Sequence, residues 1–241
     1  MNSDTAAKLI AINREFYDRF GASFSATRQR LQPGVKRILE SLNGDEKILD
    51  LGCGNGELAR ALAKRGHHSP YLGLDFSLPL LRVAESKSEG FSARFMEIDL
   101  TKLSVSSNQS LITDHWTLIT AFAVLHHIPS DEIRLNILKT VRGLLAEDGR
   151  FILSNWQFLN SEKLKGRIKP WEAAAVSGSE VDAGDYLLDW RSGGDGLRYA
   201  HHFTVEELST LAGQAGFRVK DSFLSDGESR DLGLYQVWER V

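Results

Sequence analysis

The stretch Lys47-Ile48-Leu49-Asp50-Leu51-Gly52-Cys53-Gly54-Asn55-Gly56-Glu57 decides the fold of this chain. Its first four residues have strand character, glycine then occupies every second position, and a helical pattern of apolar residues follows from position 58. A strand, a glycine loop and a helix in this order bring backbone N–H groups and the positive end of a helix against a ligand. Glycine allows the main chain to approach that ligand because no side chain stands in the way.

The residues around the glycines exclude two familiar phosphate sites. A dinucleotide fingerprint requires a glycine three positions after Gly54, where this chain has Glu57, and no G-x-x-x-x-G-K-[ST] sequence occurs. Asp50, which precedes the glycines, would repel pyrophosphate but suits the ammonium group of an amino acid. S-adenosylmethionine carries an amino acid, a ribose and an adenine without phosphates, and we predict it as the cofactor. A glycine-rich turn that binds no ligand is the alternative.

The same stretch resembles the first motif, acid-x-G-x-G-x-G, of the class I S-adenosylmethionine-dependent methyltransferases. This resemblance covers roughly residues 45–155. Strand and helix patterns alternate along the chain, which predicts an α/β fold with a doubly wound, mostly parallel sheet. The resemblance implies a Rossmann-like sheet of seven strands in the order 3-2-1-4-5-7-6, with the seventh strand antiparallel.

Length and composition predict one methyltransferase domain over residues 1–241, of which 42% are hydrophobic. We divide it into an N-terminal helical cover (1–44), a cofactor-binding core (45–156), a substrate lid inserted after the fifth strand (157–203), and a C-terminal helix with two strands (204–241). The net charge of −3 gives no overall attraction to nucleic acid or membrane, and a single cysteine excludes an internal disulfide. Without a leader or a long apolar run, we expect a cytoplasmic protein that does not enter a membrane.

Local signals predict where several helices begin and end. Apolar spacing predicts a helix over 4–20 that is followed by a polar loop over 24–28, and proline opens a second helix over 33–42. Ser130 is expected to cap a helix, and residues 204–207 form a capping box. The aromatic side chains near the cover are interpreted as core residues: Phe16, Tyr17 and Phe24.

Acids after the second and third predicted strands complete the expected cofactor site. Asp75 ends a buried-type strand nineteen positions after Gly56, near the spacing at which a carboxylate accepts both ribose hydroxyls. Its alternative role is to cap the helix that begins near Ser77. In the resembled family, adenine lies against the acid and the apolar residue after the third strand. The expected cofactor contacts are Asp50, Gly52, Cys53, Gly54, Asp75, Phe76, Asp99, Leu100, Ala121 and Phe122.

Cys53 and the histidines are the reactive side chains of this sequence. Cys53 could act as a nucleophile, but inside the glycine loop it would lie beside the cofactor, so we interpret it as a pocket-lining residue. Six of the seven histidines form adjacent pairs whose side chains diverge, unlike the i, i+4 pair of a helical zinc site, so no metal is predicted. His126 and His127 lie at the mouth of the predicted site, where a catalytic role and simple packing both stay open.

A closer resemblance spans almost the whole chain. Its short motifs look like those of the tRNA wobble-uridine methyltransferases, which esterify a carboxymethyl group on the 5-carbon of uridine. The motifs are Tyr17, Phe24-Ser25-Ala26-Thr27-Arg28, Val124-Leu125-His126-His127, Pro170-Trp171, Arg198-Tyr199-x-His201-x-Phe203 and Glu207-Leu208. The resemblance implies tRNA as the substrate and, as in eukaryotic relatives, a small zinc-binding protein partner. A carboxylate is ionised at neutral pH and needs no general base, so the site has only to align it with the methyl group.

The resemblance and the chemistry together assign roles outside the cofactor loop. The expected catalytic residues are His126, His127 and Arg28, the last of which could hold the carboxylate. The expected substrate-binding residues are Trp156, Trp171, Arg191, Tyr199 and His201. Basic residues of the lid are expected to contact RNA phosphates beside its aromatic rings, or else to form a solvated run: Lys163, Lys165, Arg167 and Lys169.

Two other functions fit the same sequence. One is the methylation of a small metabolite, such as a carboxylic acid or a quinone precursor. The other is a cofactor-binding but inactive partner of another enzyme. DNA adenine methylation is not expected, because the turn at 121–124 lacks the N/D-P-P-Y motif of those enzymes.

Overall fold

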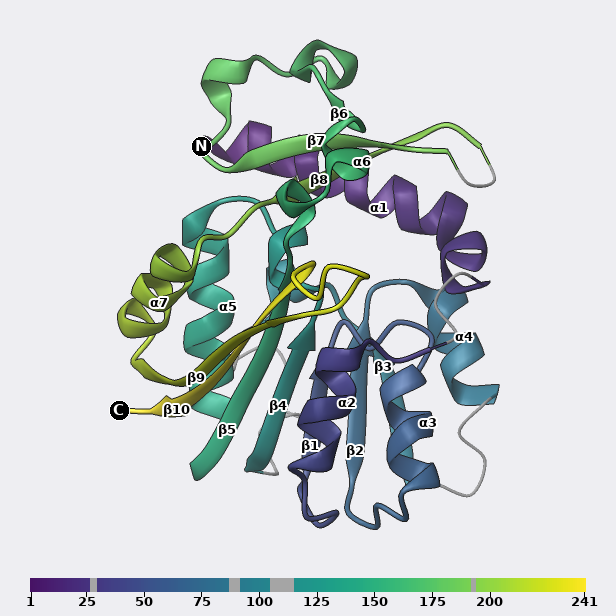
Figure 1. Ribbon diagram of the computed structural model, residues 1–241, viewed down its shortest axis with the longest axis vertical. Helices are drawn as coiled ribbons and strands as arrows, with labels where there is room; N and C mark the ends of the chain where they lie inside the picture. The colour runs from purple at the N-terminus through teal and green to yellow at the C-terminus, as the bar shows by residue number, and fades with distance from the viewer. Residues whose placement is uncertain (27–29, 87–91, 105–114, 192–193) are drawn as a thin grey trace.

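The central sheet has the strand order β3-β2-β1-β4-β5-β10-β9 (Figure 1). The computed structural model describes residues 1–241 except 27–29, 87–91, 105–114 and 192–193, and except the side chains of 22, 24 and 26. Within these residues the sheet consists of β1 Ile48–Leu51, β2 Tyr71–Asp75, β3 Ala93–Glu97, β4 Trp116–Phe122, β5 Leu145–Trp156, β9 Phe217–Ser225 and β10 Gly233–Arg240. Strands β1 to β5 pair in parallel, whereas β10 runs antiparallel to both β5 and β9. The predicted order and its antiparallel seventh strand are therefore confirmed.

Helices cover both faces of this sheet. On one face α2 (Pro33–Glu40) and α3 (Glu57–Lys64) pack against the strands, and on the other face α5 (Asp131–Leu144) and α7 (Val205–Gln214) do so. Successive residues of β1 serve the two faces in turn, because side chains alternate along a strand. Burial on both sides explains why the central strands have continuous apolar runs. In the described part of the chain, no helix combines the length and apolar character that a membrane crossing requires.

The lid segment, residues 157–203, forms a second and smaller sheet. Within its described residues the strand order is β6-β7-β8, and both pairs are antiparallel. The strands are β6 Ile168–Lys169, β7 Asp185–Trp190 and β8 Gly196–His201. Figure 1 shows this sheet together with α1 (Ser3–Ala26) at one end of the molecule, beyond the central sheet, while α4 (Leu78–Ser86) lies beside β3.

Helix α1 is attached to the lid segment through its backbone and through its aromatic rings. The side chain of Asn13 accepts a hydrogen bond from the backbone N of Tyr199 at 2.9 Å and donates one to the carbonyl of Tyr199 at 3.2 Å. The rings of Phe16 and Trp190 meet edge to face with 5.4 Å between their centres. Helix α1 and the lid segment therefore pack together at the end of the molecule beyond the central sheet.

The end of one helix, the cap of another and the start of one strand differ from the sequence prediction. Helix α1 extends into the predicted polar loop as far as Ala26, and buried Ser25 accepts a hydrogen bond from Asn55 of the glycine loop at 2.7 Å. Ser130 does not cap α5 with its side chain, and its φ is +69°; Arg134, in the first turn of α5, instead donates to the carbonyl of Ile128. Strand β5 begins at residue 145 rather than 150, directly after α5. The capping box at the start of α7 is confirmed.

Candidate active site

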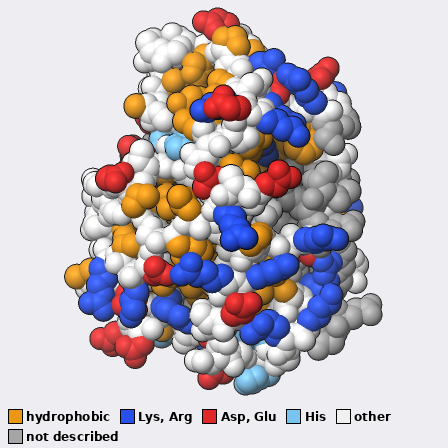
Figure 2. Space-filling view, viewed as in Figure 1, with side chains coloured by type: hydrophobic (Ala, Val, Ile, Leu, Met, Phe, Trp, Pro, Cys, Tyr) orange, Lys and Arg blue, Asp and Glu red, His pale blue; other side chains and the backbone are white. Residues whose placement is uncertain are grey.

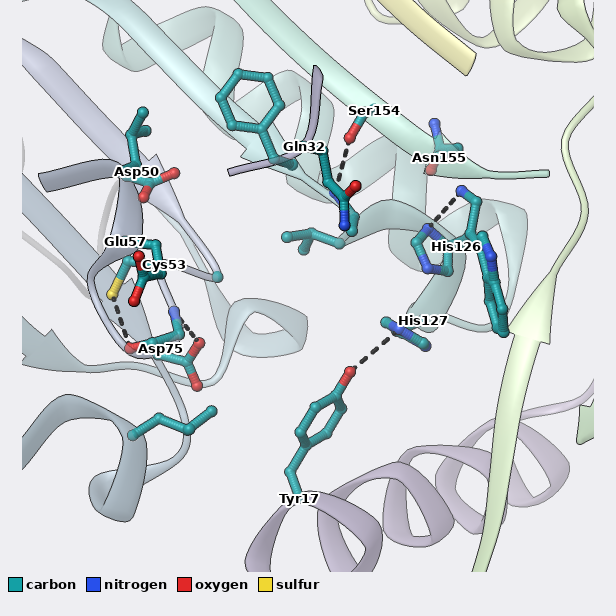
Figure 3. A pocket seen from close by; sticks show the side chains of 18 of the residues that line it. Tyr17, Gln32, Asp50, Cys53, Glu57, Asp75, His126, His127, Ser154 and Asn155 are labelled. Carbon is teal, nitrogen blue, oxygen red and sulfur yellow. Dashed lines mark hydrogen bonds between the residues drawn. The ribbon is translucent and has the colours of Figure 1, made fainter. Parts of the chain in front are cut away.

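A cavity of about 450 Å³ lies where β1, β2, β4 and β5 end, and α1 covers it from the opposite side (Figure 3). Figure 3 shows Asp50, Cys53 and Asp75 on one side of this cavity, which we call the loop end. His126 and Asn155 lie on the other side, which we call the histidine end. The cavity is therefore built where open α/β sheets bind ligands, at the carboxyl ends of parallel strands.

Two glycines shape the loop end for different reasons. Gly52 and Gly54 both have left-handed backbones, with φ of +67° and +55°. A Cβ atom at Gly52 would lie 2.5 Å from Cγ2 of Val124, so the loop can approach the neighbouring turn only without a side chain. A Cβ atom at Gly54 would meet no described atom within 4 Å, and this residue lines the cavity. The backbone at Gly54 is therefore open to a ligand.

Asp75 is held at the tip of β2 by the main chain. One carboxylate oxygen accepts a hydrogen bond from the N of Gly54, and the other accepts one from the N of Ser77, both at 2.9 Å. Burial raises the pKa of Asp75, although these backbone hydrogen bonds oppose that shift. A carboxylate has about four acceptor positions, more than these two hydrogen bonds use. Asp75 therefore caps the turn at Ser77 and can still accept hydroxyl groups in the cavity.

Asp50 is the second buried carboxylate of the loop end. It accepts hydrogen bonds from the hydroxyls of Tyr71 at 2.6 Å and Thr120 at 2.7 Å. Burial raises its pKa to about 6, because these two hydrogen bonds offset only part of the cost of burying the charge. Burial also raises the pKa of the neighbouring Cys53 thiol well above its usual value, so this thiol stays neutral and is a poor nucleophile.

The third acid, Asp99, faces helix α1 across the cavity. Arg14 forms an ion pair with it at 2.8 Å, and Thr101 donates from its backbone N and from its hydroxyl. The guanidinium carbon of Arg14 also lies 5.7 Å from the centre of the Phe76 ring. Arg14 thus closes the side of the cavity between Asp99 and Phe76.

The two histidines of the histidine end are held in different ways. Nδ1 of buried His126 lies 3.3 Å from the backbone N of Trp156 and accepts its hydrogen bond. Nδ1 of His127 lies 3.1 Å from the carbonyl oxygen of Tyr199, and its Nε2 lies 3.2 Å from the hydroxyl of Tyr17. Within the described residues, no three His, Cys, Asp or Glu side chains lie together as metal ligands.

A cation and an aromatic wall complete the histidine end. Arg198 is only 4% exposed and lines the cavity. Its guanidinium carbon lies 4.8 Å from the ring centre of Trp156, 5.2 Å from that of Phe16 and 5.8 Å from that of Trp190. The loop end is thus rich in carboxylates, whereas the histidine end carries a positive charge among aromatic rings.

Known proteins with similar sequences and structures share this architecture. A family model described as a methyltransferase domain matches residues 24–222. The chain belongs to this methyltransferase family. A protein of Encephalitozoon cuniculi that carries the name of a methyltransferase is 31% identical over 86% of this chain and 87% of its own length. A solved SAM-dependent methyltransferase of Methanosarcina mazei superposes with a TM-score of 0.66 at 23% identity, covering 88% of this chain and 98% of the other.

Relatives with named substrates are more distant and are matched over less of their length. A ubiquinone biosynthesis O-methyltransferase of Histophilus somni is 30% identical over 61% of this chain and 60% of its own. A tRNA (carboxymethyluridine(34)-5-O)-methyltransferase of Arabidopsis thaliana is 26% identical over 58% of this chain and 31% of its own. The chain therefore spans most of the Encephalitozoon protein but less than two thirds of these two.

The family and the site together make this protein an S-adenosylmethionine-dependent methyltransferase. The loop end of the cavity fits the cofactor, because Asp75 can accept hydroxyl groups and Gly54 leaves open space. Almost all of the residues expected to contact the cofactor line the cavity: Asp50, Gly52, Cys53, Gly54, Asp75, Phe76, Asp99, Leu100 and Phe122. Ala121 is a buried core residue of β4 and is not part of the lining.

The residues expected at the substrate side of the methyltransferase are placed less uniformly. His126, His127 and Trp156 line the cavity, whereas Arg28 lies outside the described residues. Four others do not line it: Trp171, Arg191, Tyr199 and His201. Arg191 is exposed and forms an ion pair with Asp189 at 2.8 Å.

Tyr199 and His201 are corrected from substrate contacts to members of a buried polar network. The hydroxyl of Tyr199 donates to Asp185 at 2.6 Å and accepts from Arg134 at 2.9 Å. The ring nitrogens of His201 lie 2.7 Å from Asp185 and 2.7 Å from Glu207. Both side chains are almost fully buried, so their polar atoms connect the lid segment to α5 and α7 rather than reaching a substrate.

Sequence reasoning missed several residues of the methyltransferase site. Tyr17 lines the cavity instead of serving only as core, while Phe16 is core as expected. Arg14 and Asn155 also line the cavity. Spacing on a predicted helix could have indicated Tyr17, because positions 10, 13, 14 and 17 lie on one helical face. No local signal identified Asn155.

Proposed function

We propose that this methyltransferase esterifies a carboxylate, and that the carboxymethyl group of a modified uridine in tRNA is its substrate. The observation that carries the proposal is Arg198, a guanidinium at the histidine end of the cavity. Arginine presents a planar set of donors that matches a carboxylate, and it stays charged at all working pH values. A positive charge opposite the acidic loop end favours an anionic acceptor over a cationic one.

The chemistry requires positioning more than proton transfer. S-adenosylmethionine supplies an activated methyl group, and an ionised carboxylate can accept it without losing a proton. The protein has to hold the carboxylate in line with that methyl group, which Arg198 supports by charge. Trp156, which also lines the cavity and lies against Arg198, offers a flat apolar surface for a base.

Support for tRNA comes from the Arabidopsis relative and from the surface of the molecule. Figure 2 shows Lys and Arg side chains gathered over the lower half of the face formed by α2, α3 and β9. The exposed basic residues of these elements include Lys36, Arg37, Lys64, Arg218 and Lys220. Such a surface can contact phosphates, although Arg37, Arg218 and Lys220 also pair with nearby acids.

The lid segment supports RNA binding less than its sequence suggested. Lys165 pairs with Glu162 at 2.7 Å, and Lys169 pairs with Asp189 at 3.3 Å. Trp190 and Tyr199 are buried in the packing between the lid and α1, so they cannot stack on an RNA base. We therefore place the proposed phosphate contacts on α2, α3 and β9 rather than on the lid.

Mass spectrometry of nucleosides tests this proposal. Purified protein is incubated with isotope-labelled S-adenosylmethionine and tRNA that carries 5-carboxymethyluridine. We expect a labelled methyl ester, sensitive to mild alkali, that disappears in Arg198→Leu and is weakened by charge reversal at Lys36 and Lys64. Unmodified tRNA alongside labelling of a small carboxylic acid would contradict the tRNA substrate. The same reaction with the protein alone tests whether it needs the small partner protein that the tRNA resemblance implies. A tRNA substrate would also agree with a cytoplasmic location.

A second candidate function is the methylation of a hydroxyl group on a small aromatic molecule. The observation that favours it is the contact between Tyr17 and Nε2 of His127, because a hydroxyl acceptor has to lose its proton to a base. The Histophilus relative acts in ubiquinone biosynthesis, as its name states. Incubation with polyhydroxylated benzoates would yield a labelled methyl ether if this function holds, and no ether if it does not.

A further inference from the structure

Asn155 is a buried amide whose side chain is unsatisfied among the described residues. It lies on β5, is 1% exposed and lines the histidine end of the cavity, where Figure 3 shows it near His126. Neither Oδ1 nor Nδ2 has a hydrogen-bond partner among the residues that the structure describes. The side chain of the neighbouring Ser154 differs in this respect, because its hydroxyl accepts from the N of Ala123.

An amide in this position is costly unless something in the cavity meets it. A buried polar group without a partner destabilises the folded state, so native proteins satisfy nearly all such groups. Water can serve this purpose in a polar cavity, but a substrate that displaces the water must replace its hydrogen bonds. Leucine would fill almost the same volume at this position without a polar group. The presence of asparagine therefore indicates a polar partner in the bound substrate.

The chemistry of the amide specifies that partner. Nδ2 donates and Oδ1 accepts, and the two atoms lie side by side. A carboxylate can accept from Nδ2 but gives Oδ1 nothing, so it satisfies only half of the amide. A group with an N–H next to a carbonyl satisfies both halves, as the imide edge of uracil does.

We propose that Asn155 recognises the imide edge of a uracil ring, with its Oδ1 accepting from N3–H and its Nδ2 donating to the adjacent carbonyl. This inference rests on the proposed function, from which it takes a modified uridine as the substrate. It concerns the base of that uridine and not its carboxylate. Arg198 would then hold the carboxymethyl group while Asn155 reads the ring that carries it. Base analogues without the N3 proton would be rejected at Asn155.

Two variants separate a role of Asn155 in substrate recognition from a role in protein stability. Asn155→Leu removes the amide, and Gln157→Met is its matched control. Gln157 is a buried amide two residues further on, but it donates to the carbonyl of Phe203 at 3.0 Å and does not line the cavity. We expect Asn155→Leu to keep or raise the thermal unfolding temperature of the ligand-free protein, and Gln157→Met to lower it.

Affinities for four nucleosides are then measured by nuclear magnetic resonance titration in the presence of S-adenosylhomocysteine. The probes are uridine, 3-methyluridine, 5-carboxymethyluridine and its 3-methyl derivative. In the wild type and in Gln157→Met, loss of the N3 proton should weaken binding about tenfold in both pairs. In Asn155→Leu the two members of each pair should bind equally. Leucine offers no acceptor for the N3 proton, so loss of that proton no longer changes the affinity.

The outcomes distinguish this inference from the proposed function. Equal wild-type affinity for uridine and 3-methyluridine, or no binding of either pair, overturns the role of Asn155. A lowered unfolding temperature in Asn155→Leu, with the N3 discrimination retained, also overturns it and makes the residue structural. If the carboxymethyl group adds no affinity while Asn155 still discriminates at N3, the carboxylate proposal fails and the role of Asn155 stands.

Discussion

The hydroxyl of Tyr17 lies 3.2 Å from Nε2 of His127, on the ring whose Nδ1 lies 3.1 Å from the carbonyl oxygen of Tyr199. A carbonyl oxygen can only accept, so Nδ1 carries a proton, and in a neutral ring this leaves Nε2 as the acceptor for the hydroxyl of Tyr17. A helix of the cover and a turn after β4 thereby place a proton-accepting pair in the cavity. A hydroxyl acceptor would need this pair as a base, whereas an ionised carboxylate acceptor would not.

Replacement of Tyr17 by phenylalanine should change kcat little if the acceptor is a carboxylate. The ring and its packing on Phe76 remain, and no proton has to be removed from an ionised acceptor. For a hydroxyl acceptor, loss of a positioned base should lower kcat by about 10²–10⁴-fold. Steady-state rates with both kinds of acceptor provide the measurement. A large fall in kcat on the tRNA substrate would contradict direct transfer to a carboxylate.

The Asp75→Ala variant should bind S-adenosylmethionine more weakly by about 1.5–3 kcal/mol, roughly tenfold to hundredfold, because charge-assisted hydrogen bonds to the ribose are lost. Calorimetric titration gives the affinity directly. Asp221→Ala is the control, since this exposed acid pairs with Arg37, does not line the cavity and should leave the affinity unchanged. An unaltered affinity in Asp75→Ala would mean that the cofactor does not use this carboxylate.

Cofactor affinity should depend on pH through Asp50. Burial raises the pKa of this carboxyl to about 6, and only its ionised form attracts the ammonium group of the cofactor. Affinity should therefore be constant above about pH 7 and fall about tenfold per unit of pH below 6, because binding then has to release a proton. Titration of the wild type and of Thr120→Val tests this, since loss of the Thr120 hydrogen bond should move the inflection to higher pH. A flat profile from about pH 5 to 8 would exclude contact between Asp50 and the ammonium group.

Alanine at Gly52 and at Gly54 should have separable effects. Both positions have positive φ, so each substitution costs a similar backbone strain of about 1–2 kcal/mol. Only Gly52→Ala adds a methyl group against Val124, and it should lower the unfolding temperature further. Gly54→Ala places its methyl group in open space at the cavity and should mainly reduce cofactor affinity. Denaturation and calorimetry of both variants provide the comparison, and equal stability with equal affinity would contradict these two roles.

The buried network around His201 should make folding stability fall as the pH rises above about 6.5. Burial lowers the pKa of His201, but hydrogen bonds to Asp185 and Glu207 outweigh it, and the net pKa is raised. A raised pKa in the folded state stabilises the protein fully below the unfolded value of about 6.5 and loses that contribution as pH rises through the folded pKa. Thermal unfolding temperatures measured as the pH rises from about 6.5 should fall in the wild type and change less in His201→Gln. Identical pH profiles for the two proteins would show that His201 does not cause the pH dependence of folding stability.

The sequence predicted most of the loop end because its signals are local. Alternation of glycine, an acid before the loop and an acid at the end of the next strand are features of consecutive residues, and the parallel sheet then brings these ends together. The same reasoning was less successful for the lid. Tyr199 and His201 belong to a motif rich in polar and aromatic residues, but β8 directs them into a network with Arg134, which is distant in the sequence.

The sequence by itself determined the alternation of strands and helices and the carboxylates of the loop end, because periodicity and glycine spacing specify backbone structure over short distances. The strand order followed from the resemblance of its motifs to the class I methyltransferases. Only the tertiary structure decided which polar side chains are satisfied within the protein and which face the cavity. His201 meets Asp185 and Glu207, whereas the amide of Asn155 meets none of the described residues. The physical reason is that a hydrogen bond depends on distances of about 3 Å between atoms from separate elements, and spacing along the chain does not encode those distances.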